Sequence, residues 1–195
     1  MVAVQHETSG RVRILSAARD LFAANGFHQT SMAELAAAAQ VSVGQIYRLF
    51  RGKEDIIEAI VDSDISDREA VMLSLQRRLD AGEIDIEETF ELLLLEVMDN
   101  PHEALSFDIL AEGFRNPHVG QTIADMCAQL RRSLGYFACA ANPNLSGEAL
   151  KGAEEIILAS MFGLGHRSLS APALSAERAA KNAAHMIVAA LRSAN

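Results

Sequence analysis

The segment SMAELAAAAQVSVGQIYRLF, residues 31–50, decides the fold class of this chain. Two pairs in it, Ser31–Glu34 and Ser42–Gln45, have the spacing of a capping box, in which a serine side chain accepts from the backbone three residues on. Two short helices are therefore predicted, one to about residue 39 and one from 42 to about 50. Two short helices joined by so tight a turn form a helix-turn-helix, whose second helix can lie in the DNA major groove.

The rest of the sequence also has helical periodicity, and no run alternates strictly between apolar and polar residues as a half-buried strand does. Glycines and prolines mark the ends: Gly26 follows one helix, and Asn100-Pro101 and Asn116-Pro117 each place a capping residue before a proline. The predicted fold is all-α with about nine helices. The others are expected up to Asn25, from Lys53 to about 81, and over roughly 86–99, 101–114, 118–141, 147–168 and 175–193.

Charge is distributed unevenly along the 195 residues, whose formal net charge is −9 at pH 7. Residues 1–56 carry six basic and five acidic side chains, whereas residues 57–100 carry three basic and 13 acidic ones. A chain of this net charge should repel nucleic acid as a whole, so a DNA contact has to be local to the first segment. A solvated acidic helix beside an ordinary one would explain the same charges equally well.

The outward face of the second short helix is polar, aromatic and basic. With Ile46 in the core and about 100° of turn per residue, the opposite side carries Gly44, Gln45, Tyr47, Arg48 and Arg51. Gln45 can pair with adenine or be occupied by the capping box, and Tyr47 can donate to a phosphate or cover the core. The two arginines can contact DNA or be solvated. Lys53, Thr30 and Ser31 stand at helix starts, where free backbone N–H groups favour anions.

Three stretches in this order, RVRILSAARDLF (11–22), GFHQTSM (26–32) and AQVSVGQIYRLFRGKE (39–54), resemble the amino-terminal domain of the tetracycline-repressor-like (TetR) transcriptional regulators. The resemblance implies a helix-turn-helix DNA-binding domain over residues 1–52 and a helical ligand-binding and dimerisation domain over 53–195. Leu49 departs from the family, in which His or another aromatic is frequent. The predicted DNA-binding residues are Thr30, Ser31, Ser42, Val43, Gly44, Gln45, Tyr47, Arg48 and Lys53.

We expect a dimer because a single recognition helix contacts too few base pairs to select one DNA site, whereas two helices related by two-fold symmetry read two half-sites. Its expected surface is the last two helices, where small residues allow close approach. These carry Ile156, Ile157, Ala159, Met161, Phe162, Gly163, Leu164 and Gly165, then Ala179, Ala183, Met186, Ile187, Ala190 and Leu191. A partly apolar small-molecule effector could be bound by apolar residues that, at helical spacing, are more often plain core: Phe90, Leu94, Met98, Phe107, Phe114, Met126, Leu130 and Phe137. His166 could face the same ligand or simply end a helix.

Catalytic motifs are absent from the sequence: it has no G-x-S-x-G, Walker loop, H-E-x-x-H or C-x-x-C. The carboxylates of Asp62, Asp64 and Asp67 point in different directions on a helix, and Cys127 and Cys139 are about 18 Å apart by helical rise. We therefore expect no enzyme activity, no metal and no cofactor. The first ten residues lack a secretory pattern, so a cytoplasmic protein with no membrane partner is expected.

The function predicted is a sequence-specific transcriptional regulator, a repressor that a small molecule releases from a palindromic DNA operator. The alternatives are a helical small-molecule-binding protein or enzyme whose amino-terminal bundle does not bind DNA, and a purely oligomeric adaptor.

Overall fold

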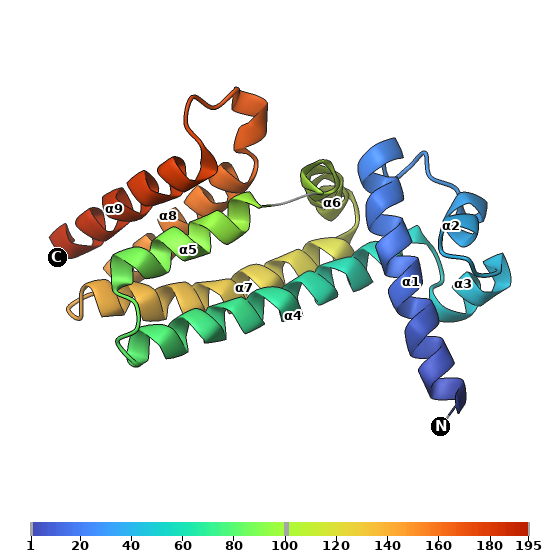
Figure 1. The fold of residues 1–195 in the computed structure, drawn as a ribbon, viewed down its shortest axis with the longest axis horizontal. Coiled ribbons are helices and arrows are strands. Elements are labelled where there is room, and N and C mark those ends of the chain that lie inside the picture. Colours follow the sequence, from blue (N-terminus) through green and yellow to red (C-terminus); the bar gives the residue numbers. More distant parts are fainter. Residues whose placement is uncertain (1, 100–101, 195) are drawn as a thin grey trace. The chain divides into compact units, whose positions relative to one another are not determined.

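A computed structural model of the chain describes residues 2–99 and 102–194 (Figure 1), with side chains from residue 10 onward. These residues form helices and no strand, so the predicted all-α fold is confirmed. In chain order the helices are α1 (Val2–Asn25), α2 (Met32–Ala38), α3 (Val43–Leu49), α4 (Lys53–Asp80), α5 (Ile86–Met98), α6 (Glu103–Arg115), α7 (Pro117–Ala141), α8 (Gly147–Gly165), the 3-10 turn η1 (Arg167–Ser170) and α9 (Ala176–Ser193).

The helix ends agree with the predicted boundaries in most places. Gly26 follows α1 with φ +84°, a left-handed conformation that glycine adopts without strain. Pro117 is the first residue of α7, and the side chain of Asn116 accepts a hydrogen bond from the backbone of His118 at 3.0 Å. The predicted cap at Asn100-Pro101 lies outside the described residues.

One helix ends earlier than predicted. α8 stops at Gly165 rather than near residue 168, and the chain continues as the 3-10 turn η1. His166 leaves the helical conformation, with φ −119° and ψ 22°, and its Nδ1–H donates to the Phe162 carbonyl at 2.7 Å. This side chain thus binds a carbonyl at the end of the helix, where carbonyls lack intrahelical partners.

The described residues pack as two compact units. One contains the residues up to Ile65 together with His102–Ala124, and the other contains those from Ser66 to Asp99 and from Asp125 onward. These packing units differ from the division expected after residue 52, because α6 and the start of α7 pack in the first unit. The division by function, 1–52 against 53–195, stays a prediction.

The core of the first unit joins α1, α2, α3 and the start of α4. Ile14 and Phe22 of α1, Leu35 of α2 and Ile46 of α3 are almost completely buried, each contributing about 1.5–3 kcal/mol through removal from water. Phe22 packs edge-on against Phe27, with ring centroids 5.3 Å apart. This core holds the two short helices, which are too short to be stable alone.

The second unit is built from α5, α8 and α9 with parts of α4 and α7. Phe90 of α5 and Phe137 of α7 are buried with their ring centroids 6.3 Å apart. The buried amide of Asn142 donates to the carbonyls of Leu191 and Ala194, each at 2.9 Å, which fixes the end of α9. Among the described helices, none has the length and apolar character needed to cross a membrane.

Candidate nucleic-acid interface

α2 begins with a complete capping box, as predicted. The Ser31 hydroxyl accepts from the backbone N–H of Glu34 at 3.2 Å, and the Glu34 carboxylate accepts from the backbone N–H of Ser31 at 2.8 Å. The hydrogen bonds from the Ser31 backbone and hydroxyl lower the pKa of the exposed Glu34 carboxyl below its ordinary value. These contacts fix the start of α2 at the surface.

α3 begins at Ser42, whose hydroxyl accepts from the backbone N–H of Gln45 at 3.1 Å. The Gln45 side chain lies against α1 instead of completing the box: a Cβ placed on Gly10 would be 2.9 Å from Gln45 Nε2. Gln45 is half-buried because its side chain lies against α1. A side chain at residue 10 would require the flexible end of the Gln45 side chain to shift.

The outward face of α3 is accessible in the way the helical periodicity predicts. Ile46 is fully buried, whereas Tyr47 is 54% exposed. No atom lies within 4 Å of a Cβ added at Gly44, so this part of the helix surface is open. Ser31, Ser42, Val43, Gly44, Tyr47 and Arg48 are all exposed, which makes them available to a partner.

Thr30 is a correction to the sequence analysis. Its side chain is only 1% exposed, and its hydroxyl lies within hydrogen-bond distance of the carbonyls of Gly26 (3.0 Å) and Leu21 (3.4 Å). A side chain buried in this way closes the end of α1 and is not exposed on the surface that Ser31 occupies. Helix-start spacing alone could not distinguish it from the exposed Ser31.

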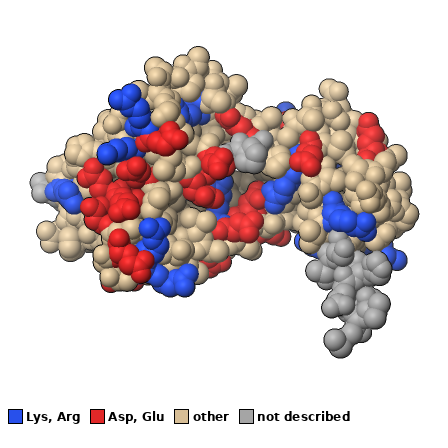
Figure 2. Space-filling model, viewed as in Figure 1, with Lys and Arg blue, Asp and Glu red and all other residues tan. Residues whose placement is uncertain are grey.

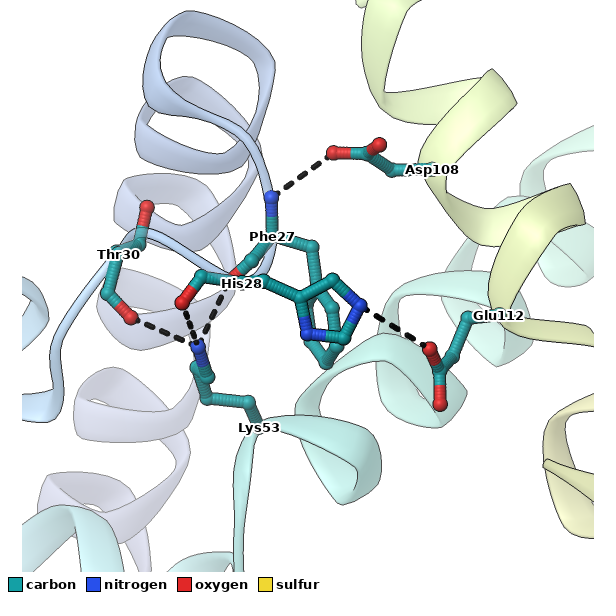
Figure 3. Close-up of polar contacts among 6 residues, drawn as sticks. All are labelled: Phe27, His28, Thr30, Lys53, Asp108 and Glu112. Carbon is teal, nitrogen blue, oxygen red and sulfur yellow. Dashed lines mark hydrogen bonds and ion pairs between the residues drawn. The ribbon is translucent and has the colours of Figure 1, made fainter. Parts of the chain in front are cut away.

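Lys53 also differs from the expectation of a surface cation. Its side chain is half-buried, and its Nζ donates to the backbone carbonyls of Phe27, His28 and Thr30 at 2.8, 2.9 and 3.0 Å (Figure 3). The loop between α1 and α2 therefore surrounds the ammonium group.

Two carboxylates of α6 approach the same loop from the other side. Asp108 Oδ2 accepts from the backbone N–H of Phe27 at 2.8 Å, and Glu112 Oε2 lies 3.7 Å from His28 Nε2 (Figure 3). Sequence reasoning missed both, because Asp108 and Phe27 are 81 residues apart and no local pattern relates them.

Two exposed arginines of α1 lie beside the helix-turn-helix and were also not predicted. The Arg11 guanidinium is 5.2 Å from the ring centroid of Phe50, at the end of α3, and Arg13 donates to the Gln40 carbonyl in the turn between α2 and α3 at 3.3 Å. They add positive charge to the α3 surface. On the face shown in Figure 2, by contrast, acidic side chains gather in clusters over the second unit.

The predicted effector-binding residues separate into two groups. Phe90, Leu94, Leu130 and Phe137 are buried in the second unit, and Met98, Met126 and His166 are half-buried in it. Phe107 and Phe114 lie on α6 in the first unit, where both are exposed, Phe114 to 94%. These two are a correction, because they do not belong to the apolar cluster that the others form.

The predicted dimer surface is corrected in part. Ile157, Met161 and Leu191 are buried within the second unit, so they are core residues. Ile156 of α8 and Met186 of α9 are exposed to 68% and 70%, although both are large and apolar. The exposed residues of the two helices also include the small Ala159, Gly163 and Ala190.

Among the described side chains, no three His, Cys, Asp or Glu residues gather where they could hold a metal ion. Cys127 and Cys139 are free thiols, and burial raises the pKa of the Cys127 thiol.

Comparison with known proteins relates the first unit to one family. The family described as bacterial regulatory proteins, tetR family, matches residues 14–60, from α1 into α4. The HTH-type transcriptional regulator UidR of Escherichia coli (strain K12) is 31% identical over 134 residues, which are 63% of this chain and 64% of UidR. The chain thus spans less than two thirds of this curated relative.

Solved structures extend the likeness to nearly the whole chain. Salmonella enterica GusR has a TM-score of 0.67 at 26% identity, covering 92% of this chain and 95% of GusR. Bacillus subtilis FadR in complex with stearoyl-CoA shares the fold, with a TM-score of 0.68 at 16% identity, covering 91% of this chain and 97% of FadR. Residues 14–60 thus match the tetR family of bacterial regulatory proteins, and the chain is similar to UidR over 134 residues and to GusR over nearly its whole length.

Proposed function

We propose that the protein is a sequence-specific DNA-binding transcriptional regulator. The observation that carries the proposal is the exposed face of α3, where Gly44 is open to solvent and Tyr47 and Arg48 are accessible beside the exposed Ser42. A helix with such a face can enter the major groove, with polar groups at base edges and the phosphates. The basic side chains of Arg11 and Arg13 lie beside it and add to the positive charge of Arg48.

The regulator is proposed to act as a homodimer on a palindromic operator. Two-fold related recognition helices read half-sites about 34 Å apart. The exposed Ile156 and Met186 support α8 and α9 as the dimer surface. Burying these large apolar side chains against a second protomer removes them from water, which lowers the free energy. The small Ala159 and Gly163 on α8 would let two such helices approach closely.

A partly apolar small molecule is proposed to release the protein from DNA in the cytoplasm, so that the protein acts as a repressor. The aromatic residues of the second unit, Phe90 and Phe137, support an apolar ligand, and FadR, which shares this fold, is bound to stearoyl-CoA. Such a ligand can change DNA affinity only if it binds one arrangement of the protein better than the other.

The test is selection of bound duplexes from random DNA by the purified full chain. The expected product is a two-fold symmetric sequence. Affinity for it should fall when the Tyr47 hydroxyl is removed in Tyr47→Phe, while the control Tyr136→Phe, on the second unit, leaves affinity unchanged. Recovery of no preferred duplex, even at low ionic strength, would overturn the DNA-binding proposal.

The dimer is tested separately by sedimentation. Ile156→Glu and Met186→Glu should each give monomers, whereas Leu73→Glu, at another exposed apolar position, should leave the dimer intact. A wild-type chain that sediments as a monomer would refute the proposed dimer.

An effector is identified by the rise it causes in the unfolding temperature. It must then lower the affinity for the selected duplex; unchanged affinity at saturating concentration excludes it as an inducer.

A further inference from the structure

Lys53 is the first residue of α4, and its side chain reaches back over the loop between α1 and α2. Its Nζ is 2.8 Å from the Phe27 carbonyl, 2.9 Å from that of His28 and 3.0 Å from that of Thr30 (Figure 3). An ammonium group has three N–H donors and no acceptor. Three carbonyl partners therefore use its whole donor capacity.

The charge of Lys53 is also compensated locally. The ammonium lies 5.0 Å from the ring centroid of Phe27, within the range of a cation–π interaction. To contact a DNA phosphate directly, it would have to give up at least one carbonyl in a half-buried loop. That carbonyl would lose a charge-assisted hydrogen bond, which is stronger than a neutral one.

The loop that Lys53 holds determines where the helix-turn-helix begins. Phe27 is buried, with its N–H bound to Asp108, and the Thr30 hydroxyl faces the end of α1. The next residue, Ser31, caps α2. Carbonyls fixed at residues 27, 28 and 30 therefore fix the start of α2, and through the buried Leu35 and Ile46 the position of α3.

We infer that Lys53 is a positioning residue, which orders the loop of residues 27–30 and so places α2 and α3, and that it does not neutralise a DNA phosphate. The inference rests on the proposed DNA binding. It departs from the role that the family resemblance implies for this position, since here the ammonium binds the protein's own backbone.

The first test is the salt dependence of DNA binding, measured with the duplex recovered by selection. The logarithm of the binding constant falls linearly with the logarithm of the salt concentration, and each phosphate that the protein neutralises makes this slope steeper by about 0.9. Lys53→Met keeps the length of the side chain and removes the donors. We expect it to lower affinity about tenfold at every salt concentration, without changing the slope.

Two further variants make this test specific. Arg48→Met removes an exposed cation from the face of α3 and should reduce the slope by about 0.9 if Arg48 contacts a phosphate. Lys53→Arg keeps the charge, but a planar guanidinium does not match three carbonyls around one point. If Lys53 positions the loop, the arginine variant loses affinity; if it only contacts a phosphate, the variant keeps it.

The second test is hydrogen exchange of the DNA-free protein. The amides of Phe27 and Thr30 should exchange faster in Lys53→Met than in the wild type and remain unchanged in Arg48→Met. A slope reduced by about 0.9 in Lys53→Met, or unchanged exchange in the loop, overturns the inference. If the wild type binds no duplex, the proposed function fails by itself, and exchange alone then decides whether Lys53 orders the loop.

Discussion

Gly44 allows stability and DNA binding to be separated with a single methyl group. It is the second residue of α3, its backbone does not have positive φ, and an added Cβ meets nothing within 4 Å. Alanine should therefore fit without strain. Because glycine in a helix is about 0.8–1.0 kcal/mol less favourable than alanine, Gly44→Ala should stabilise the protein by up to about 1 kcal/mol. For a chain of this size that corresponds to a rise of roughly 2–4 °C in unfolding temperature.

The same methyl group should weaken DNA binding. If α3 lies in the major groove, the space around Gly44 is filled by DNA, and overpacking a close contact costs about 1–3 kcal/mol. Affinity for the selected duplex, followed by fluorescence anisotropy, should fall by a factor of about five to 150. Stability and affinity thus change in opposite directions.

The matched control is Ala128→Gly, on the exposed side of α7 in the second unit. It should destabilise the protein by about 1 kcal/mol and leave DNA affinity unchanged. Should Gly44→Ala stabilise the protein and bind DNA as tightly as the wild type, Gly44 does not face the groove and the proposed orientation of α3 is wrong. Should it destabilise the protein, the described environment of Gly44 is wrong.

Three further outcomes are expected. Asp108→Ala removes the acceptor of the Phe27 N–H and should lower the unfolding free energy in urea by about 1.5–3 kcal/mol, whereas Asp108→Asn, which keeps an oxygen, should cost less; equal losses would contradict the role of that oxygen. The pKa of Glu34 is lowered in the folded chain, so its stabilising contribution is present above the ordinary pKa of a glutamate and is lost as pH falls through the lowered value. Carboxyl NMR titration should show the low midpoint, and Glu34→Gln should lack this acid-dependent loss; a midpoint at the ordinary value would count against the capping box with Ser31. Ile46→Ala, at a fully buried position in α3, should cost about 2–5 kcal/mol in thermal unfolding, and a loss below 1 kcal/mol would show that α3 is not packed as described.

The helices could be predicted from local features because their ends depend on local chemistry. Gly26 adopts a left-handed conformation, Ser31 and Glu34 form a capping box, and Pro117 starts α7. Each of these signals acts within a few residues of the helix end it determines. α8 was expected to reach about residue 168 but ends at Gly165, and His166, which was expected either to face a ligand or to end a helix, lies at that end with its ring bound to a carbonyl.

In the candidate site, the sequence predicted side-chain exposure correctly only where the helical periodicity of α3 determines which residues face the solvent. The outward side of α3 follows from the burial of Ile46, so Gly44 and Tyr47 were placed correctly at the surface. The surroundings of Thr30 and Lys53 depend on how the loop folds back over the end of α1, which no helical period describes. Residues at helix starts therefore look equivalent in sequence and have different roles in the folded chain.

The packing of α6 with the amino-terminal helices limits how the protein can be divided. A fragment that stops within α4 would lack Asp108 and Glu112, so the Phe27 N–H and the His28 ring would lose their partners. A chimera that joins residues 1–52 to the body of a relative would face the same loss unless that body supplies equivalent carboxylates. The unit proposed to bind DNA is thus discontinuous in sequence, and a transplant that keeps these contacts has to carry α6 together with the amino-terminal helices.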